Sequence, residues 1–184
     1  MANADQPNGF RPVGHVSGGV IRFQDGFKIE AAYATALFRG DAVVLTSGFV
    51  VKATDSSTLI LGVFWGCRYR DSDGATKFRP DWVASTATLG SEAVEAFVHV
   101  DPGIIYRVQT DTGTAYVDAT HTGGTYDIEI DHAGSAITGQ SGMEIDLNDT
   151  SDGQFRVLGL VDEPGNAAGV NAKILVVNSL PFIS

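Results

Sequence analysis

The chain has only one cysteine, Cys67, among its 184 residues, so no disulfide can form within it. Its four histidines, His15, His99, His121 and His132, are scattered, and no C-x-x-C or H-x-x-x-H spacing occurs. We therefore expect no structural zinc site, no other metal and no cofactor. A chain of this length buries enough apolar surface to fold without a disulfide or a metal ion.

Basic residues are also scarce. Lys and Arg number 12 against 22 Asp and Glu, which gives a formal net charge of −10. Proteins that bind nucleic acid or anionic membranes rely on clustered Lys and Arg, so we expect neither partner. The one loose arginine cluster, Arg68, Arg70 and Arg79, is interleaved with Tyr69 and Phe78. Arginine beside aromatic rings is enriched at protein–protein interfaces; the alternative is three solvated charges at a strand edge.

Long apolar runs are missing as well. No stretch approaches the roughly 18 apolar residues that a membrane-spanning helix needs. No basic segment followed by an apolar run opens the chain, as it would in a secretory signal. We expect synthesis in a cytosol.

Catalytic and ligand-binding motifs are absent. The chain contains no G-x-S-x-G, no phosphate-binding loop and no dinucleotide-binding glycine pattern. Gly139-Gln140-Ser141-Gly142 comes nearest to a nucleophile turn, but no helix is expected after it. The acidic stretch 146–153 fails the EF-hand spacing and is expected to be a solvated turn. The sequence favours a protein that is not an enzyme.

Two other classes of function stay open as alternatives. A β-barrel hydrolase could use His99 with Asp101, and a carbohydrate-binding module could use Trp65, Tyr69 and Trp82 as stacking platforms. Both tryptophans are also explained as core or interface residues.

Glycine, in contrast, is abundant, with 22 residues placed singly or in pairs between short apolar runs. This pattern predicts many short strands joined by tight turns. The turn signals are Asp25-Gly26, Ser47-Gly48, Asp71-Ser72-Asp73-Gly74 and Asp101-Pro102-Gly103. The expected strands are 20–23, 27–30, 42–45, 49–53, 58–65, 93–100, 104–110, 125–131, 143–147, 155–161 and 172–177.

These elements predict an all-β fold, a single β-barrel or sandwich of short antiparallel strands. The segment 31–38 is the one candidate helix, of at most two turns. Residues 1–19 are polar and rich in Pro and Gly, so we expect an extended N-terminal arm there and a β-rich structural domain over 20–184.

Three stretches of the chain together resemble a known family. They are 3–13 (NADQPNGFRPV) with 18–22 (GGVIR), 38–43 (FRGDAV) with 60–69 (ILGVFWGCRY), and 157–166 (VLGLVDEPGN). They are similar to the head decoration, or cement, proteins of tailed bacteriophages, particularly short-tailed ones. The likeness spans most of the chain and is weakest over 112–149.

The resemblance implies a β-rich virion protein, commonly a homotrimer, assembled in the host cytoplasm. It would sit on the capsid exterior and clamp the major capsid protein subunits where they meet. An acidic surface is compatible with the outer face, because packaged DNA would repel it. A tail, head–tail connector or fibre-base component is the alternative within the virion.

A cement protein needs an extended edge or arm that reaches its neighbours. We expect the segment Asn8, Phe10, Arg11, Pro12 and Val13 to do this, with Phe10 as the apolar anchor and Arg11 reaching a carboxylate. The alternative is that this arm packs on its own barrel.

Overall fold

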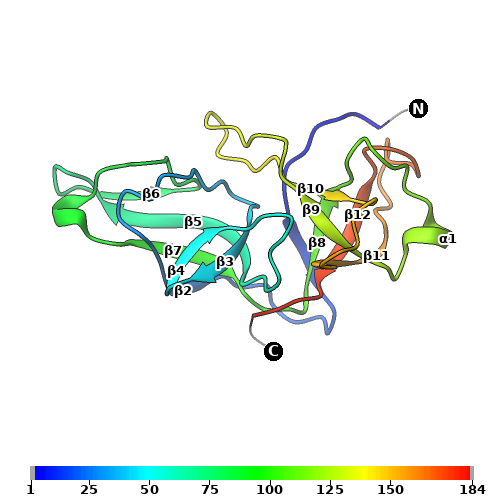
Figure 1. Ribbon diagram of the computed structural model, residues 1–184, viewed down its shortest axis with the longest axis horizontal. Helices are drawn as coiled ribbons and strands as arrows, with labels where there is room; N and C mark the ends of the chain where they lie inside the picture. Colours follow the sequence, from blue (N-terminus) through cyan, green and yellow to red (C-terminus); the bar gives the residue numbers. More distant parts are fainter. Residues whose placement is uncertain (1–2, 183–184) are drawn as a thin grey trace.

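Two antiparallel sheets make up the protein in the computed structural model, which describes residues 3–182 (Figure 1). Sheet A contains β1 (Arg11–His15), β8 (Ile104–Gln109), β9 (Thr125–Glu129), β10 (Glu144–Asp146), β11 (Phe155–Leu160) and β12 (Lys173–Asn178). Sheet B contains β2 (Gln24–Ile29), β3 (Ala42–Thr46), β4 (Phe49–Lys52), β5 (Gly62–Arg70), β6 (Thr76–Arg79) and β7 (Val94–His99). The helical parts of the described chain are one turn of α-helix, α1 (Asp118–His121), and a 3-10 turn over Leu89–Ser91. The all-β expectation is confirmed.

The two sheets lie side by side along the long axis of the molecule (Figure 1). The buried hydrophobic residues form two clusters, one under each sheet, and the cluster of sheet A also includes Ala42 and Val63 of sheet B. The strand order is β1-β8-β12-β11-β9-β10 in sheet A, and β2-β7-β5-β3-β4 in sheet B with β6 paired to the second half of β5. The largest buried side chains around sheet A are Tyr106, Tyr116, Phe10 and Phe155, and around sheet B they are Trp82 and Phe64. The chain therefore builds two cores.

Two turns join strands as the sequence predicts. Ser47 and Gly48 connect β3 to β4 with φ values of 51° and 84°, which is the left-handed conformation of a two-residue hairpin turn. Asp71 to Gly74 connects β5 to β6, and the Asp71 carboxylate accepts hydrogen bonds from the backbone of Asp73 and Ala75.

The predicted hairpin around Asp25-Gly26 is wrong. These residues lie inside β2, where the register against β7 shifts between Gln24 and Phe27. Gly26 has φ 90°, so its left-handed conformation produces a bulge within one strand and no reversal of the chain.

The predicted helix over 31–38 is also wrong, because tertiary pairing overrides a weak local preference. Leu37 exchanges backbone hydrogen bonds of 3.1 and 2.7 Å with Trp82, and both side chains are fully buried beneath sheet B. Ala32 has φ 57°, which a helix does not allow.

The N-terminal segment packs on its own chain. Asn3 to Phe10 has no regular secondary structure, and Arg11–His15 continues as β1, an edge strand paired with β8. The expected boundary at residue 19 therefore does not coincide with the beginning of the sheets, because β1 lies within residues 1–19 and belongs to sheet A. Residues 1–2 of the expected arm and residues 183–184 of the expected domain lie outside the described residues.

The buried side-chain amide of Gln154 links the two sheets by hydrogen bonds. Its Nε2 donates to the backbone carbonyls of Thr54, Asp55 and Ser57, at 2.9, 2.8 and 2.9 Å, in the segment that follows β4. Its Oε1 accepts from the backbone N–H of Ile128 in β9 at 3.0 Å. Because Gln154 is completely buried, these bonds fix the position of one sheet against the other.

Candidate protein-binding surface

Aromatic and arginine side chains gather on the outer face of sheet B. In β7, Val94, Ala96 and Val98 point into the core, so Phe97 lies on the opposite face. Its neighbours there come from β5, β6 and the segments before β2 and β3. We call this set the aromatic–arginine face, and it consists of Arg22, Phe23, Arg39, Trp65, Arg68, Phe78 and Phe97.

The rings and guanidinium groups of this face contact one another. The ring centroids of Phe23 and Phe97 are 5.2 Å apart. The Arg39 guanidinium lies 4.5 Å from the centroid of Trp65, and its Nε donates to the Trp65 carbonyl at 3.1 Å. The Arg68 guanidinium lies 5.9 Å from the Phe78 ring, as expected for cross-strand partners.

The face is hollowed rather than flat. An open hollow of about 590 Å³ lies over Pro12, Ile21, Phe23, Trp65 and His99. A second hollow, of about 280 Å³, shares Phe23 and Trp65 with the first. Because the two adjoin, they form one continuous concave surface with an apolar floor.

Its charge is opposite to that of the whole chain. Three of the eight arginines lie on it, whereas the formal net charge of the protein is −10. One carboxylate offsets them, because Glu95 pairs with Arg68. A concave, aromatic and positively charged surface is suited to a protein partner that presents carboxylates.

The loose arginine cluster seen in the sequence is only partly on this face. Arg68 and Phe78 belong to it, whereas Arg79 points to the opposite side with its cross-strand partner Cys67 and pairs with the buried Asp81 at 3.0 Å. Arg70 pairs with Glu92 at 2.7 Å, and Tyr69 packs edge-on against the buried Trp82. Sequence reasoning missed Phe23, Arg39 and Phe97 because they lie in separate segments. The period-two burial of β7 is the only signal that could have indicated Phe97.

The residues expected to form the binding arm differ in their burial and contacts. Phe10 is fully buried and its ring stacks on Phe155 at 4.3 Å, so the expectation that it anchors a neighbouring subunit is corrected. Arg11 bonds the Asn8 carbonyl and the Gln140 side chain of its own chain. Pro12 lines the larger hollow and Val13 is 51% exposed, so these two remain at the surface.

The structure does not assemble the residues of the alternative hydrolase. Asp101 pairs with His15 at 3.1 Å, while His99 Nδ1 lies 3.1 Å from the Arg22 carbonyl. Burial lowers the pKa of His99 and favours its neutral form. Ser141 is also buried, and its Oγ accepts the Met143 N–H.

The stacking platform of the alternative carbohydrate-binding module is not formed either. Trp82 is completely buried and Tyr69 packs edge-on against it, so these two rings do not join Trp65 in one exposed platform. In the acidic stretch 146–153, Asp146 and Asp149 accept backbone N–H groups of residues two positions on, as in ordinary turns.

One group of side chains among residues 3–182 has the ligand types and spacing for a metal ion: Asp5, His132 and Glu144. Burial, with the Asp5 carboxylate second, raises the pKa of Glu144 to about 8. No motif indicates this group, because its members come from three distant segments.

The single cysteine lies under the aromatic–arginine face and is expected to be unreactive. Cys67 is fully buried, and burial raises the pKa of its thiol to about 12. A thiol reagent such as Ellman's reagent should therefore react negligibly with the native protein at mildly alkaline pH, and with one thiol per chain after denaturation. Rapid labelling of the native protein would contradict this burial.

No protein-family model, curated protein or solved structure matches this chain. No helix within residues 3–182 is long and apolar enough to span a membrane.

Proposed function

We propose that this chain is a head decoration, or cement, protein of a tailed bacteriophage. It is a non-enzymatic structural protein that binds the capsid exterior and stabilises contacts between major capsid protein subunits. The observation that carries the proposal is the aromatic–arginine face, which is a concave apolar surface with three arginines on an otherwise acidic chain. The resemblance of three stretches of the sequence to that family supports it.

The charge distribution favours the outer side of the shell. The acidic remainder of the surface would be repelled by packaged DNA, whereas the arginines of the face would pair with carboxylates of the capsid protein. Trp65 and Phe23 on the floor would supply the apolar anchors that dominate the affinity of such interfaces. The protein would act as a homotrimer, assembled with the particle in the host cytoplasm.

Particles that lack this protein provide the test. We expect wild-type protein to cosediment with them and to occupy sites between capsid subunits by cryo-EM. The double variant Phe78→Ser with Arg39→Ser should lose at least about tenfold in affinity, since it removes one exposed ring and one stacked guanidinium from the face.

A matched control removes one exposed apolar side chain and one arginine elsewhere. Ile137→Ser with Arg156→Ser also deletes one exposed apolar side chain and one arginine, and should bind like wild type. Equal loss in both double variants would contradict the assignment of the face. Density at a single vertex would replace the decoration role with one in the tail or connector.

A further inference from the structure

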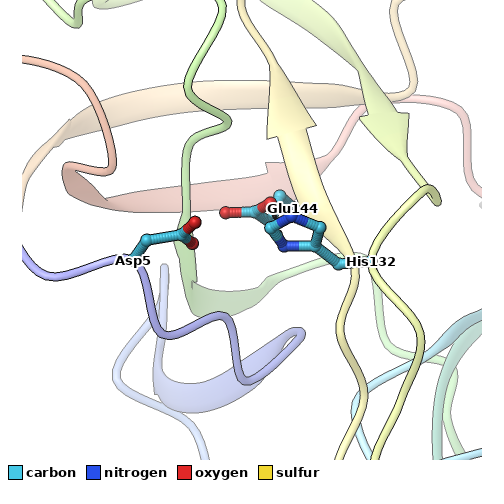
Figure 2. A group of neighbouring side chains, drawn as sticks. All are labelled: Asp5, His132 and Glu144. Atoms are coloured by element: carbon cyan, nitrogen blue, oxygen red, sulfur yellow. Dashed lines mark ion pairs between the residues drawn. The ribbon is translucent and has the colours of Figure 1, made fainter.

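Three segments far apart in the sequence bring metal-ligating side chains to one point at the edge of sheet A (Figure 2). Asp5 comes from the N-terminal segment, His132 from the loop after β9, and Glu144 from the first position of β10. Their ligand atoms all lie within 4.8 Å of one another, and His132 Nδ1 is 3.0 Å from Glu144 Oε2. Ligand atoms around an ion with bonds of about 2.1 Å are separated by roughly 3 to 4.3 Å.

The charge at this point is not balanced by any lysine or arginine. Glu144 is only 2% exposed, and a carboxylate oxygen of Asp5 lies within 4.8 Å of one of its own. Among residues 3–182, no Lys or Arg forms an ion pair with Asp5 or Glu144. A buried carboxylate beside other carboxylates is costly unless a cation compensates it.

A neighbouring amide holds the two carboxylates in place. Gln109 is 3% exposed, and its Oε1 accepts the backbone N–H of Gln6 at 3.2 Å. Its NH₂ group must therefore face the carboxylates, and it donates to Asp5 at 3.2 Å and to Glu144 at 3.1 Å. In known metal sites, hydrogen bonds of this kind, from a residue that does not itself contact the ion, orient the carboxylate ligands.

We propose that Asp5, His132 and Glu144 bind a divalent transition-metal ion, Zn²⁺ or Mn²⁺, with water completing its coordination. An imidazole with two carboxylates suits these ions better than Ca²⁺ or Mg²⁺, which prefer oxygen ligands alone. The ion cross-links the N-terminal segment and the loop after β9 to β10. This site is separate from the aromatic–arginine face, so it does not depend on the proposed function.

Isothermal titration and thermal unfolding of the full chain, stripped with EDTA and returned to chelator-free buffer near neutral pH, test the proposal. With ZnCl₂ or MnCl₂ as the probe, we expect saturable binding of one ion per chain and a melting temperature about 5 °C higher. His132→Ala and Glu144→Gln should each abolish both effects. The side chain of His132 is 42% exposed, so His132→Ala is expected to fold.

His15→Ala is the matched control. His15 also pairs with a carboxylate, Asp101, at 3.1 Å, but the pair belongs to no group of three potential ligands among residues 3–182. This variant should keep the wild-type stoichiometry and the rise in melting temperature. The proposal is overturned if neither ion binds with one-to-one stoichiometry, or if His132→Ala binds it as tightly as His15→Ala does.

Discussion

Phe10→Ala is expected to lower the free energy of unfolding of the isolated protein by about 3–5 kcal/mol. The Phe10 side chain is fully buried, stacks on Phe155 at a centroid distance of 4.3 Å and meets Tyr106 edge-on at 6.2 Å. Its removal leaves a cavity in the core of sheet A. Urea unfolding followed by tryptophan fluorescence measures the change.

Val13→Ala provides the comparison, because Val13 lies three residues further on, in β1, but is 51% exposed. We expect a change within about 0.5 kcal/mol for it. If Phe10→Ala left the stability unchanged and weakened only the binding to particles, Phe10 would be an anchor to a neighbouring subunit, and its burial in this chain would not describe the free protein.

Gln154→Glu is expected to destabilise the protein strongly although it changes only one atom of the side chain. The new carboxylate would face the carbonyls of Thr54, Asp55 and Ser57, which lose their donor. It would also lie close to Asp127, whose carboxylate accepts the backbone N–H of residue 154. Leaving buried groups unpaired beside a charge costs about 3 kcal/mol or more.

The pH dependence of the stability of this variant shows whether the new buried charge causes the loss. Burial and the surrounding oxygens would raise the pKa of the new carboxyl in the folded state, so the folded state binds more protons than the unfolded state. The stability of the variant should therefore fall, relative to wild type, as the pH rises above the ordinary pKa of a glutamate. Gln24→Glu, at an exposed position of β2, should show no such loss. A pH-independent difference would contradict this account.

Most of the strands could be predicted from the sequence because their signals are local. Ser47-Gly48 and Asp71 to Gly74 form the turns that their residue types favour. Asp25-Gly26 carries the same kind of signal and yet lies within β2, since a glycine with positive φ serves a bulge as well as a turn. Leu37 illustrates a second reason why local signals fail. Its backbone pairs with Trp82, which is far away in the sequence.

The candidate surface could be predicted only in part. Arg68 and Phe78 are cross-strand partners joined by a short turn, so their proximity follows from a predicted hairpin. Arg39 reaches Trp65 from outside the strands of sheet B, and Phe23 reaches Phe97 from the segment before β2. The Asp5, His132 and Glu144 group depends on long-range placement alone, which no spacing in the sequence encodes.

The pairing of β1 with β8 has a consequence for the kinetics of folding. His15 is the register partner of Ile104, and all of sheet B lies between them in the chain. Closing so long a loop costs conformational entropy before any contact between β1 and β8 compensates it, whereas β3 and β4 need only a two-residue turn. During synthesis, β1 is made before β8 and stays unpaired until β8 has emerged. Sheet B is thus expected to form early, and the first strand of the chain to be among the last that pair.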